Sequence, residues 1–449
     1  MFFLYSLVTG AAMLLASPYF LLQAMRRGQS FGSLRQRFGW SYAAELRAGE
    51  AGAIWVHAVS VGELLAVLPL LRRLKERFPQ RRLVISTTTA TGQRLARERL
   101  AWADTIFYFP LDWRGPVRRA LAAVRPGMIV IAETEIWPNF LRAAGERGVP
   151  VAFVNGRLSE RSYARLRRAA SISPRAFGGF ERRVLSFASV YMMQSDADAE
   201  RLMELGAPRA RVIVNGNLKY DLALPERGAL HEWLIPELQR AHRGPVLIAG
   251  SLAEGEERPV LEALATIERE WPAALLIVAP RKPQHFDPAA REIESRGRAA
   301  IRRSALDFTL DRGGADSGIG APGSVLLLDS VGELAGLYAL AEVVFVGGSL
   351  VPVGGHNILE PAIAGRVPVH GPSMENFRDV AVRFRDAAAG IEVADAAALA
   401  AAWSALLRDT RERERRGADA KALVERYRGA TEAAVERLSA LLDPARGAS

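Results

Sequence analysis

The sequence predicts an α/β protein with two doubly wound, Rossmann-like domains, each a parallel β-sheet covered by helices, preceded by an apolar helix. Three observations carry this prediction. Short apolar runs alternate with amphipathic runs after residue 40, this alternation stalls near residue 225, and a second series begins near residue 245. Such alternation is typical of βα units, whose strands pair in parallel. With 449 residues, the chain is long enough for two such cores.

The apolar helix comes first. Residues 1–25 contain no charged side chain, and this stretch is long enough to cross a bilayer. The first charged residues are arginines that follow it, which by the positive-inside rule places the rest of the chain in the cytoplasm. They are Arg26, Arg27, Arg35 and Arg37. We therefore expect residues 1–25 to form a membrane anchor, either spanning the bilayer or lying in its interface.

The first domain is expected over residues 26–225. Its longest predicted helix carries Leu64, Leu68 and Leu71 along one face, as a helix packed on a sheet should. The expected strands are 53–59, 83–88, 128–132, 149–155, 189–194 and 212–214, and the expected helices are 63–78, 91–100, 137–147 and 196–205.

Residues 226–244 are expected to be a linker, because three prolines interrupt the pattern around them: Pro225, Pro236 and Pro245. The second domain is expected over 245–449, with an irregular connection at 309–324 and a long helical tail after Ala396. Its expected strands are 246–249, 274–279, 325–328 and 343–346, and its expected helices are 255–270, 286–296 and 332–340.

Amino-acid composition and net charge exclude several classes of protein and of functional site. A hydrophobic fraction of 49% with 24% charged residues excludes extensive disorder. The chain has no cysteine, which excludes disulfides, thiolate zinc sites and cysteine nucleophiles. The net charge of +10 comes mainly from arginine and favours an anionic partner, such as a phosphorylated substrate or an acidic membrane surface. No nucleic-acid-binding motif accompanies the arginines, so we expect no nucleic-acid partner.

Candidate ligand-binding residues follow the predicted strands, where ligands bind in doubly wound sheets. In the second domain, residues 343–361 contain two Gly-Gly pairs, the second being Gly354 and Gly355, and then a helix start at Asn357. Glycines allow close backbone approach, and N–H groups at a helix start attract anions, so this segment is expected to bind a nucleotide phosphate. His356 could donate to that phosphate. Glu360 has either capping-box spacing from Asn357 or accepts hydrogen bonds from a ribose.

Two more strand-end segments belong to the same domain. Arg281 and Lys282 follow the strand 274–279 and are read either as phosphate ligands or as a solvated turn. Glu333 lies in the turn 329–333, which connects a predicted strand to a predicted helix.

In the first domain, Glu63 opens a helix directly after a strand. An acid there can stabilise the helix dipole, or it can act as a base facing a substrate. The dipole would lower its pKa, so burial or substrate must compensate. Glu133 and Glu135 form a carboxylate pair after another strand, and Lys219 is notable because lysine is rare in this chain. A compact ammonium could stabilise developing negative charge.

A DxD pattern, Asp196-Ala-Asp198, matches that of metal-dependent glycosyltransferases. It opens a predicted helix, so Asp196 is better read as an N-cap, and we expect no metal site there.

These motifs, in this order, resemble those of the membrane-associated Kdo transferases, which move 3-deoxy-D-manno-oct-2-ulosonic acid (Kdo) from its CMP ester to a lipid A precursor. The resemblance covers essentially the whole chain. The matching segments are the apolar N-terminus, HAVSVGE, ISTTTATG, AETEIWPN, VNGRLSERS, GNLKYD, APRKPQHF, SVGEL and FVGGSLVPVGGHNILEP.

The resemblance implies the GT-B architecture, two Rossmann-like domains facing a cleft, and an inverting reaction that needs no metal or other cofactor. It makes Glu63 the catalytic base and gives Glu133 and Lys219 transition-state roles, with Glu135 as the alternative to Glu133. By the same resemblance, CMP contacts fall on Pro280, Arg281, Val331, Gly332, Glu333, Asn357, Ile358, Leu359 and Glu360.

The resemblance further implies a location at the cytoplasmic face of the inner membrane, with the first domain binding the lipid A precursor and the second binding CMP-Kdo. The number of Kdo residues transferred, the acylation of the acceptor and the oligomeric state stay open. Two alternatives also stay open: a transferase that uses a UDP-sugar, and a membrane-tethered module that binds anions without catalysis.

Overall fold

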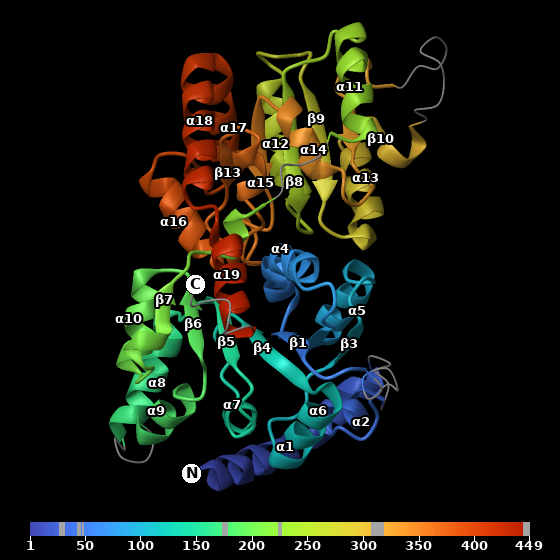
Figure 1. The fold of residues 1–449 in the computed structure, drawn as a ribbon. Coiled ribbons are helices and arrows are strands. Elements are labelled where there is room, and N and C mark those ends of the chain that lie inside the picture. Colours follow the sequence, from blue (N-terminus) through green and yellow to red (C-terminus); the bar gives the residue numbers. More distant parts are fainter. Residues whose placement is uncertain are drawn as a thin grey trace. The chain divides into compact units, whose positions relative to one another are not determined.

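The structure is a computed structural model that describes residues 1–26, 32–42, 46, 49–172, 178–222, 227–306 and 318–442 (Figure 1). The chain forms two compact units. Unit 1 comprises Met1–Asp221 and Arg428–Ser449, and unit 2 comprises Leu222–Tyr427. Arg27 and most of the expected irregular connection at 309–324 lie outside the described residues.

Unit 1 is built on a parallel sheet, as predicted. Seven strands are found among its described residues, in the order β3-β2-β1-β4-β5-β6-β7, and each neighbouring pair is parallel. The strands are β1 Ala53–Ala58, β2 Leu83–Thr87, β3 Thr105–Tyr108, β4 Pro126–Ala132, β5 Val151–Gly156, β6 Val190–Met193 and β7 Val212–Val214.

Helices of unit 1 cover both faces of this sheet. In β1, Trp55 packs into a core that includes Phe140, whereas Ile54 and Val56 pack into a second core that includes Leu71. This alternation shows that β1 is buried on both sides, as in a doubly wound sheet. The helices are α1 Phe2–Arg26, α2 Gly32–Arg37, α4 Val61–Arg77, α5 Ala90–Arg99, α6 Arg114–Val124, α7 Pro138–Gly145, α8 Glu160–Ile172, α9 Gly179–Leu185, α10 Asp196–Glu204 and α19 Ala430–Leu442, with short 3-10 turns η2 Arg209–Arg211 and η3 Leu218–Tyr220.

Unit 2 repeats the architecture. Its described residues form a second seven-stranded parallel sheet, in the order β10-β11-β9-β8-β12-β13-β14. Two doubly wound α/β units are therefore confirmed. The strands are β8 Val246–Leu252, β9 Leu275–Pro280, β10 Ala300–Arg302, β11 Val325–Leu327, β12 Val343–Val346, β13 Pro368–His370 and β14 Ile391–Glu392.

The helices of unit 2 include one in the segment expected to be a linker. That helix, α11, spans Ala229–Arg240, and its buried Leu230 and Leu234 lie one turn apart. The ring Nδ1 of His231 lies 2.8 Å from the carbonyl oxygen of Gly336, which ties the helix to unit 2. The linker prediction for 226–244 is thus corrected. The other helices are α12 Glu257–Ile267, α13 Phe286–Ser295, α14 Leu334–Leu337, α15 Leu359–Ile363, α16 Arg378–Asp386, α17 Ala396–Arg408 and α18 Thr410–Arg426, with 3-10 turns η4 Pro283–His285, η5 Arg303–Ala305, η6 Tyr338–Leu340 and η7 Glu375–Phe377.

The last helix corrects the expected extent of the second domain. α19 belongs to unit 1, where Ala434, Val435 and Leu438 are buried in the same core as Leu71 of α4. Asp221 accepts hydrogen bonds from the N–H groups of Gly429 and Thr431, which fixes the start of α19 beside η3. The predicted helical tail is therefore real, but it ends in the core of the first unit.

The N-terminal helix α1 packs on unit 1 through its polar and aromatic side chains. The amide of Asn139 donates to Ser6 Oγ at 3.0 Å, and the indole of Trp113 donates to Thr9 Oγ1 at 3.2 Å. The hydroxyl of Tyr5 donates to Asp112, a buried carboxylate whose pKa burial raises to about 6. Ser6 and Thr9, which interrupt the apolar run in the sequence, are thus its docking residues.

The opposite side of α1 is apolar and exposed. Phe3 is 82% exposed, Leu7 58% and Leu14 77%. In the described part of the chain, we find no helix whose length and hydropathy would suffice to cross a bilayer. Arg37, one of the arginines that follow α1, donates to the carbonyl oxygen of Thr88 and lies 4.5 Å over the ring of Tyr108.

Candidate functional site

The candidate residues of unit 1 lie where the strand order of its sheet reverses. Strands β1 and β4 are neighbours, and the chain leaves them in opposite directions along the sheet. Glu63 follows β1, and Glu133 follows β4. The structure therefore brings these two predicted residues to one switch point, which is where doubly wound sheets bind ligands.

Glu63 lies in the first turn of α4 and bonds to the N-cap residue, Ser60. Its N–H donates to Ser60 Oγ at 3.4 Å, and the Ser60 hydroxyl donates to Glu63 Oε1 at 2.9 Å. The N–H of Val59 donates to Glu63 Oε2 at 2.8 Å. The cap fixes the carboxylate in place but uses only part of its accepting capacity, so capping does not prevent it from binding a substrate proton.

The pKa of Glu63 is raised to about 7, chiefly by burial, although the N–H of Val59 lowers it. The negative charge of Glu133 raises the pKa of Glu63 further, and Glu135 adds to this effect. Burial and the neighbouring carboxylates therefore outweigh the decrease in pKa that the helix dipole was expected to cause. This is the compensation that a base at this position needs. A carboxylate with a pKa near the working pH is suited to general-base catalysis.

His57, six residues earlier, is not suited to the same role. It is fully buried in β1, and burial lowers its pKa to about 3. Its ring stacks on Phe109 at 3.8 Å, and Nδ1 lies 3.1 Å from the carbonyl oxygen of Ser86. The ring is therefore neutral near pH 7 and serves as a packed part of the core.

Glu133 and Glu135 both lie on the turn that leaves β4. Glu133 adopts a left-handed backbone with φ of 53°, stabilised by a 2.9 Å hydrogen bond from its N–H to the carbonyl oxygen of Val154. A non-glycine residue in this conformation costs about 1–3 kcal/mol, and such strain is concentrated at functional sites. Burial raises the pKa of Glu135, and the charge of Glu133 adds to this effect. The strained backbone favours Glu133 as the residue placed for function.

Lys219 sits on the 3-10 turn η3, which a buried amide network positions. Asn155 Oδ1 accepts from the N–H of Leu218 at 3.0 Å, and Asn217 Oδ1 accepts from the N–H of Lys219 at 3.0 Å. Gln194 joins the two asparagines, donating to the Asn155 carbonyl oxygen at 2.9 Å and accepting from Asn217 Nδ2 at 2.9 Å. Sequence analysis missed Asn155 and Gln194, whose only signal was their position at the ends of two strands.

In unit 2, the N–H groups of the two glycine pairs all bond within the protein. The N–H of Gly347 donates to Gly250, that of Gly348 to Glu256, that of Gly354 to Ser373 and that of Gly355 to Gly348. A Cβ at Gly347 would lie 2.6 Å from the Cα of Leu252, so close packing explains why glycine is needed there. The N–H groups of both glycine pairs are therefore occupied within the protein, whereas phosphate binding at the helix start after them stays a prediction.

The segment after the glycine pairs is ordered by Asn357. Its Oδ1 accepts from the N–H of Leu359 at 3.1 Å, and its Nδ2 donates to Glu360 Oε1 at 3.2 Å. Burial raises the pKa of Glu360, while Asn357 and the charge of Arg281 lower it. The charge of Arg281 thus reaches Glu360. The N-cap of α15 is Ile358, which makes no side-chain cap bond, so the capping-box interpretation of Asn357 and Glu360 is corrected: their side chains bond to each other instead. Ile358 and Leu359, the next two residues of this segment, are buried.

His356 and Tyr338 lie in the same region. Nδ1 of His356 is 2.9 Å from the carbonyl oxygen of Gly347, so that nitrogen is held by the backbone rather than aimed at a ligand. Burial and the charge of Arg281 lower the pKa of His356. Burial raises the pKa of Tyr338, the charge of Glu360 raises it further, and the charge of Arg281 lowers it. Sequence analysis missed Tyr338, which carries no motif signal.

The other predicted residues of unit 2 differ in how they are held. Glu333 forms a bidentate ion pair with Arg303, with Nε–Oε2 and Nη2–Oε1 distances of 2.9 Å each, so its carboxylate already has a cation. Val331 is 66% exposed, and Gly332 has a φ of 102°. Pro280 ends β9, with Arg281 and Lys282 exposed directly after it.

The described residues contain no cluster of three or more His, Asp or Glu side chains arranged to hold a metal ion. The DxD pattern is a helix cap, as the sequence suggested, but the N-cap is Ser195 rather than Asp196. Ser195 Oγ accepts from the N–H of Asp198 at 3.2 Å, and Asp198 Oδ1 accepts from the N–H of Leu158 at 2.8 Å.

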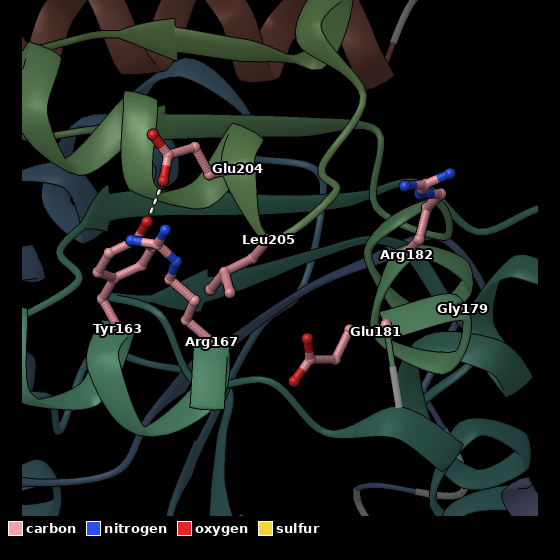
Figure 2. A pocket seen from close by; sticks show the side chains of 8 residues that line it. Tyr163, Arg167, Gly179, Glu181, Arg182, Glu204 and Leu205 are labelled. Carbon is pink, nitrogen blue, oxygen red and sulfur yellow. Dashed lines mark hydrogen bonds between the residues drawn. The ribbon is translucent and has the colours of Figure 1, made fainter. Parts of the chain in front are cut away.

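A separate pocket of about 290 Å³ opens among α8, α9 and α10 of unit 1 (Figure 2). Tyr163 and Arg167 from α8 line one side of it, where the Tyr163 hydroxyl donates to Glu204. The carboxylate of Glu181 points into its centre, and burial raises the pKa of this group. None of the residues predicted from the sequence lines this pocket, so it is distinct from the candidate site.

Comparisons with known proteins agree on one family. A sequence model described as 3-Deoxy-D-manno-octulosonic-acid transferase (kdotransferase) matches residues 32–222. The chain is 35% identical over 447 residues to the 3-deoxy-D-manno-octulosonic acid transferase of Bordetella pertussis, an alignment that covers 94% of this chain and 96% of that protein. It is 32% identical over 395 residues to the protein of the same name from Haemophilus influenzae, covering 87% of this chain and 86% of that one.

Among solved structures, that of Anabaena HepE in complex with UDP is similar, with a TM-score of 0.53, 13% sequence identity and coverage of 88% of this chain and 100% of that one. At this identity the likeness concerns the fold alone.

Proposed function

The chain belongs to the 3-deoxy-D-manno-octulosonic acid transferase family and is a glycosyltransferase, and from this premise we propose that it transfers Kdo from CMP-Kdo to a lipid A precursor with inversion at the anomeric carbon. The GT-B architecture implied by the family is part of this proposal. The observation that carries the mechanism is Glu63, a buried carboxylate with a pKa of about 7 at the switch point of unit 1.

In the proposed reaction, Glu63 removes the proton of an acceptor hydroxyl as that oxygen attacks the anomeric carbon of Kdo. The bond from that carbon to the phosphate oxygen breaks, and CMP leaves as a phosphate monoester. The proposal places the acceptor against unit 1, because Glu63, Glu133 and Lys219 follow strands β1, β4 and β7 of that unit. Their positions are fixed by caps and amide networks rather than by long flexible segments, which favours catalysis.

Negative charge grows on the CMP phosphate during this step. We propose that Arg281 of unit 2 stabilises it through its positive charge and that Lys219 contributes. Pro280, the segment 331–333 and the segment 357–360 are proposed as the other CMP contacts. The ion pair of Glu333 with Arg303 suits a contact through the backbone of this turn better than one through the Glu333 carboxylate.

The proposed reaction uses no cofactor and no metal ion, and one experiment tests it. Purified protein is incubated with CMP-Kdo and a tetraacylated lipid A precursor in the presence of EDTA, and the mass of the product is measured by mass spectrometry. We expect a Kdo-bearing product whose mass gives the number of sugars added, and we expect competition by CMP but not by UDP. Competition by UDP alone would instead favour the uridine-nucleotide alternative.

We also propose that the protein works at the cytoplasmic face of the inner membrane, with α1 lying in the interface. The support is the orientation of α1: its polar side chains dock on unit 1, whereas Phe3, Leu7 and Leu14 are exposed. An apolar face of this kind is stabilised when it is buried at the headgroup boundary. The lipid A precursor lies in the same layer, so this placement brings enzyme and acceptor together.

Replacing Phe3, Leu7 and Leu14 with serine should reduce vesicle binding about a thousandfold or more, because burial of each large apolar side chain contributes about 1.5–3 kcal/mol and every 1.4 kcal/mol is about tenfold in affinity. Binding is measured by flotation with vesicles of phosphatidylethanolamine and phosphatidylglycerol. Val382→Ser, at an exposed apolar residue of unit 2, is the matched control and should float like wild type. Undiminished flotation of the triple variant would place the membrane contact elsewhere.

A further inference from the structure

The glycine segment after β12 is organised around a buried carboxylate that the sequence analysis did not single out. Glu256 has no exposed surface and lies between β8 and α12, at the switch point where β8 neighbours β12. Four backbone N–H groups converge on its carboxylate. They belong to Ala253 at 2.8 Å and Gly348, both on Oε2, and to Ser349 at 2.9 Å and Leu350 at 2.8 Å, both on Oε1.

The N–H groups form an anion-binding site, and the side chain of Glu256 occupies it in place of a bound ligand. Successive N–H groups that point into one concavity form a nest that binds phosphates and other anions. Here three successive residues, 348–350, supply such N–H groups, and all the partners of Glu256 are donors. A carboxylate accepts hydrogen bonds on both oxygens and can therefore use all four N–H groups. The nest is already filled by an acidic side chain of the protein itself.

The charges around the nest limit what else can bind. His356 Nδ1 lies 2.9 Å from the carbonyl oxygen of Gly347, whose neighbour Gly348 donates to Glu256, so the ring and the carboxylate hold the same glycine segment. The charge of Arg281 also reaches His356, because it lowers the pKa of that ring. Arg281 also acts on Glu360. A ligand phosphate beside Arg281 thus finds one guanidinium. A second phosphate nearer the glycine segment would be repelled by the buried charge of Glu256 and would find the N–H groups of residues 348–350 already used.

We propose that Glu256 is a positioning and specificity-determining residue: by filling the N–H nest at residues 348–350, it fixes the glycine segment and selects a sugar donor with one phosphate over one with two. This inference rests on the proposed function, in which the nucleotide is CMP. It also explains why a glycine-rich strand end, which in sequence suits a diphosphate equally well, would serve a nucleoside monophosphate here.

The test compares the binding of CMP and CDP to the full-length protein by calorimetry in EDTA, so that no metal masks the extra charge of CDP. We expect wild type to bind CMP about tenfold or more tightly than CDP, because a fixed negative charge opposes the second phosphate. Glu256→Ala should reduce this preference about tenfold, since it removes the charge and opens the nest. Glu254→Gln, at an exposed acid of the same loop, is the matched control and should behave like wild type.

An unchanged preference for CMP in folded Glu256→Ala would overturn the inference, as would a wild type that prefers CDP. Wild type that binds neither nucleotide would instead contradict the proposed donor, so the two failures are distinct. Should Glu256→Ala fail to fold, Glu256→Asp decides the question. Its shorter carboxylate keeps the charge but cannot reach all four N–H groups, so it should retain the preference for CMP and bind CMP several times more weakly. Unaltered CMP affinity in Glu256→Asp would overturn the positioning role.

Discussion

Glu63→Gln should reduce the rate of Kdo transfer about a thousandfold, within the range of 10²–10⁴ typical for loss of a general base. Glutamine can still accept from the N–H of Val59 and contact Ser60, so α4 should keep its cap. The thermal midpoint and CMP affinity should therefore stay close to those of wild type while kcat falls. Measuring all three separates a missing base from a damaged fold.

The pH dependence of the rate provides a second readout of the same residue. Because Glu63 acts as a base only when it is deprotonated, kcat of wild type should rise with pH and level off above about 7. The raised pKa also means that the folded state holds this proton more tightly than the unfolded state does. Stability from Glu63 is thus lost as pH rises from the ordinary glutamate range through about 7, and Glu63→Gln should lose less stability than wild type over that interval.

A folded Glu63→Gln variant with wild-type activity would show that the base is another group. Glu133 and then Glu135 would be the next residues to replace, because both carboxylates are close enough to Glu63 to influence its pKa.

Lys219→Met should lower kcat about a hundredfold, because loss of a preorganised charge at the reacting centre typically costs 10²–10³. Methionine matches the length of the lysine stem, and η3 should persist because Asn155 and Asn217 hold it through the backbone. Lys421→Met is a matched control, since Lys421 lies on the exposed side of α18. Transfer rates of the two variants at saturating CMP-Kdo provide the comparison.

The absence of cysteine permits a sharper version of this experiment. Lys219→Cys introduces the only thiol in the chain, and alkylation with 2-bromoethylamine converts it to a near copy of lysine. We expect the thiol form to be impaired like Lys219→Met and the alkylated form to recover most of the activity. Equal activity of the two forms would rule out a role for the ammonium charge.

The sequence was sufficient for the parts of the fold that depend on local pattern. β1 and α4 were predicted because every residue of the strand is buried and one face of the helix carries leucines. β3, by contrast, was missed because only Phe107 of its four residues is fully buried, which weakens the pattern of a short edge strand. α11 was missed because its Pro236 was taken as a break, although the helix continues through it.

In the candidate site, too, some features follow from local sequence pattern and others only from the folded structure. Strand-end position identified Glu63, Glu133 and Lys219, but the direction of the Glu63 pKa shift depends on burial and on Glu133, which only the folded structure supplies. The glycine pairs were assigned to a ligand because their partner is remote in sequence. Glu256 precedes Gly348 by 92 residues, so no local pattern connects the two.

The place of α19 has a consequence for how the protein is made. The core of unit 1 includes Ala434, Val435 and Leu438, which the ribosome adds only after all of unit 2 has been synthesised. Unit 2 is one uninterrupted stretch of chain, Leu222–Tyr427, and can complete its sheet first, although it starts later. Until translation nears its end, the face of α4 that α19 covers lacks its partner. The nascent enzyme thus exposes an unfinished apolar surface on its first half for longer than on its second.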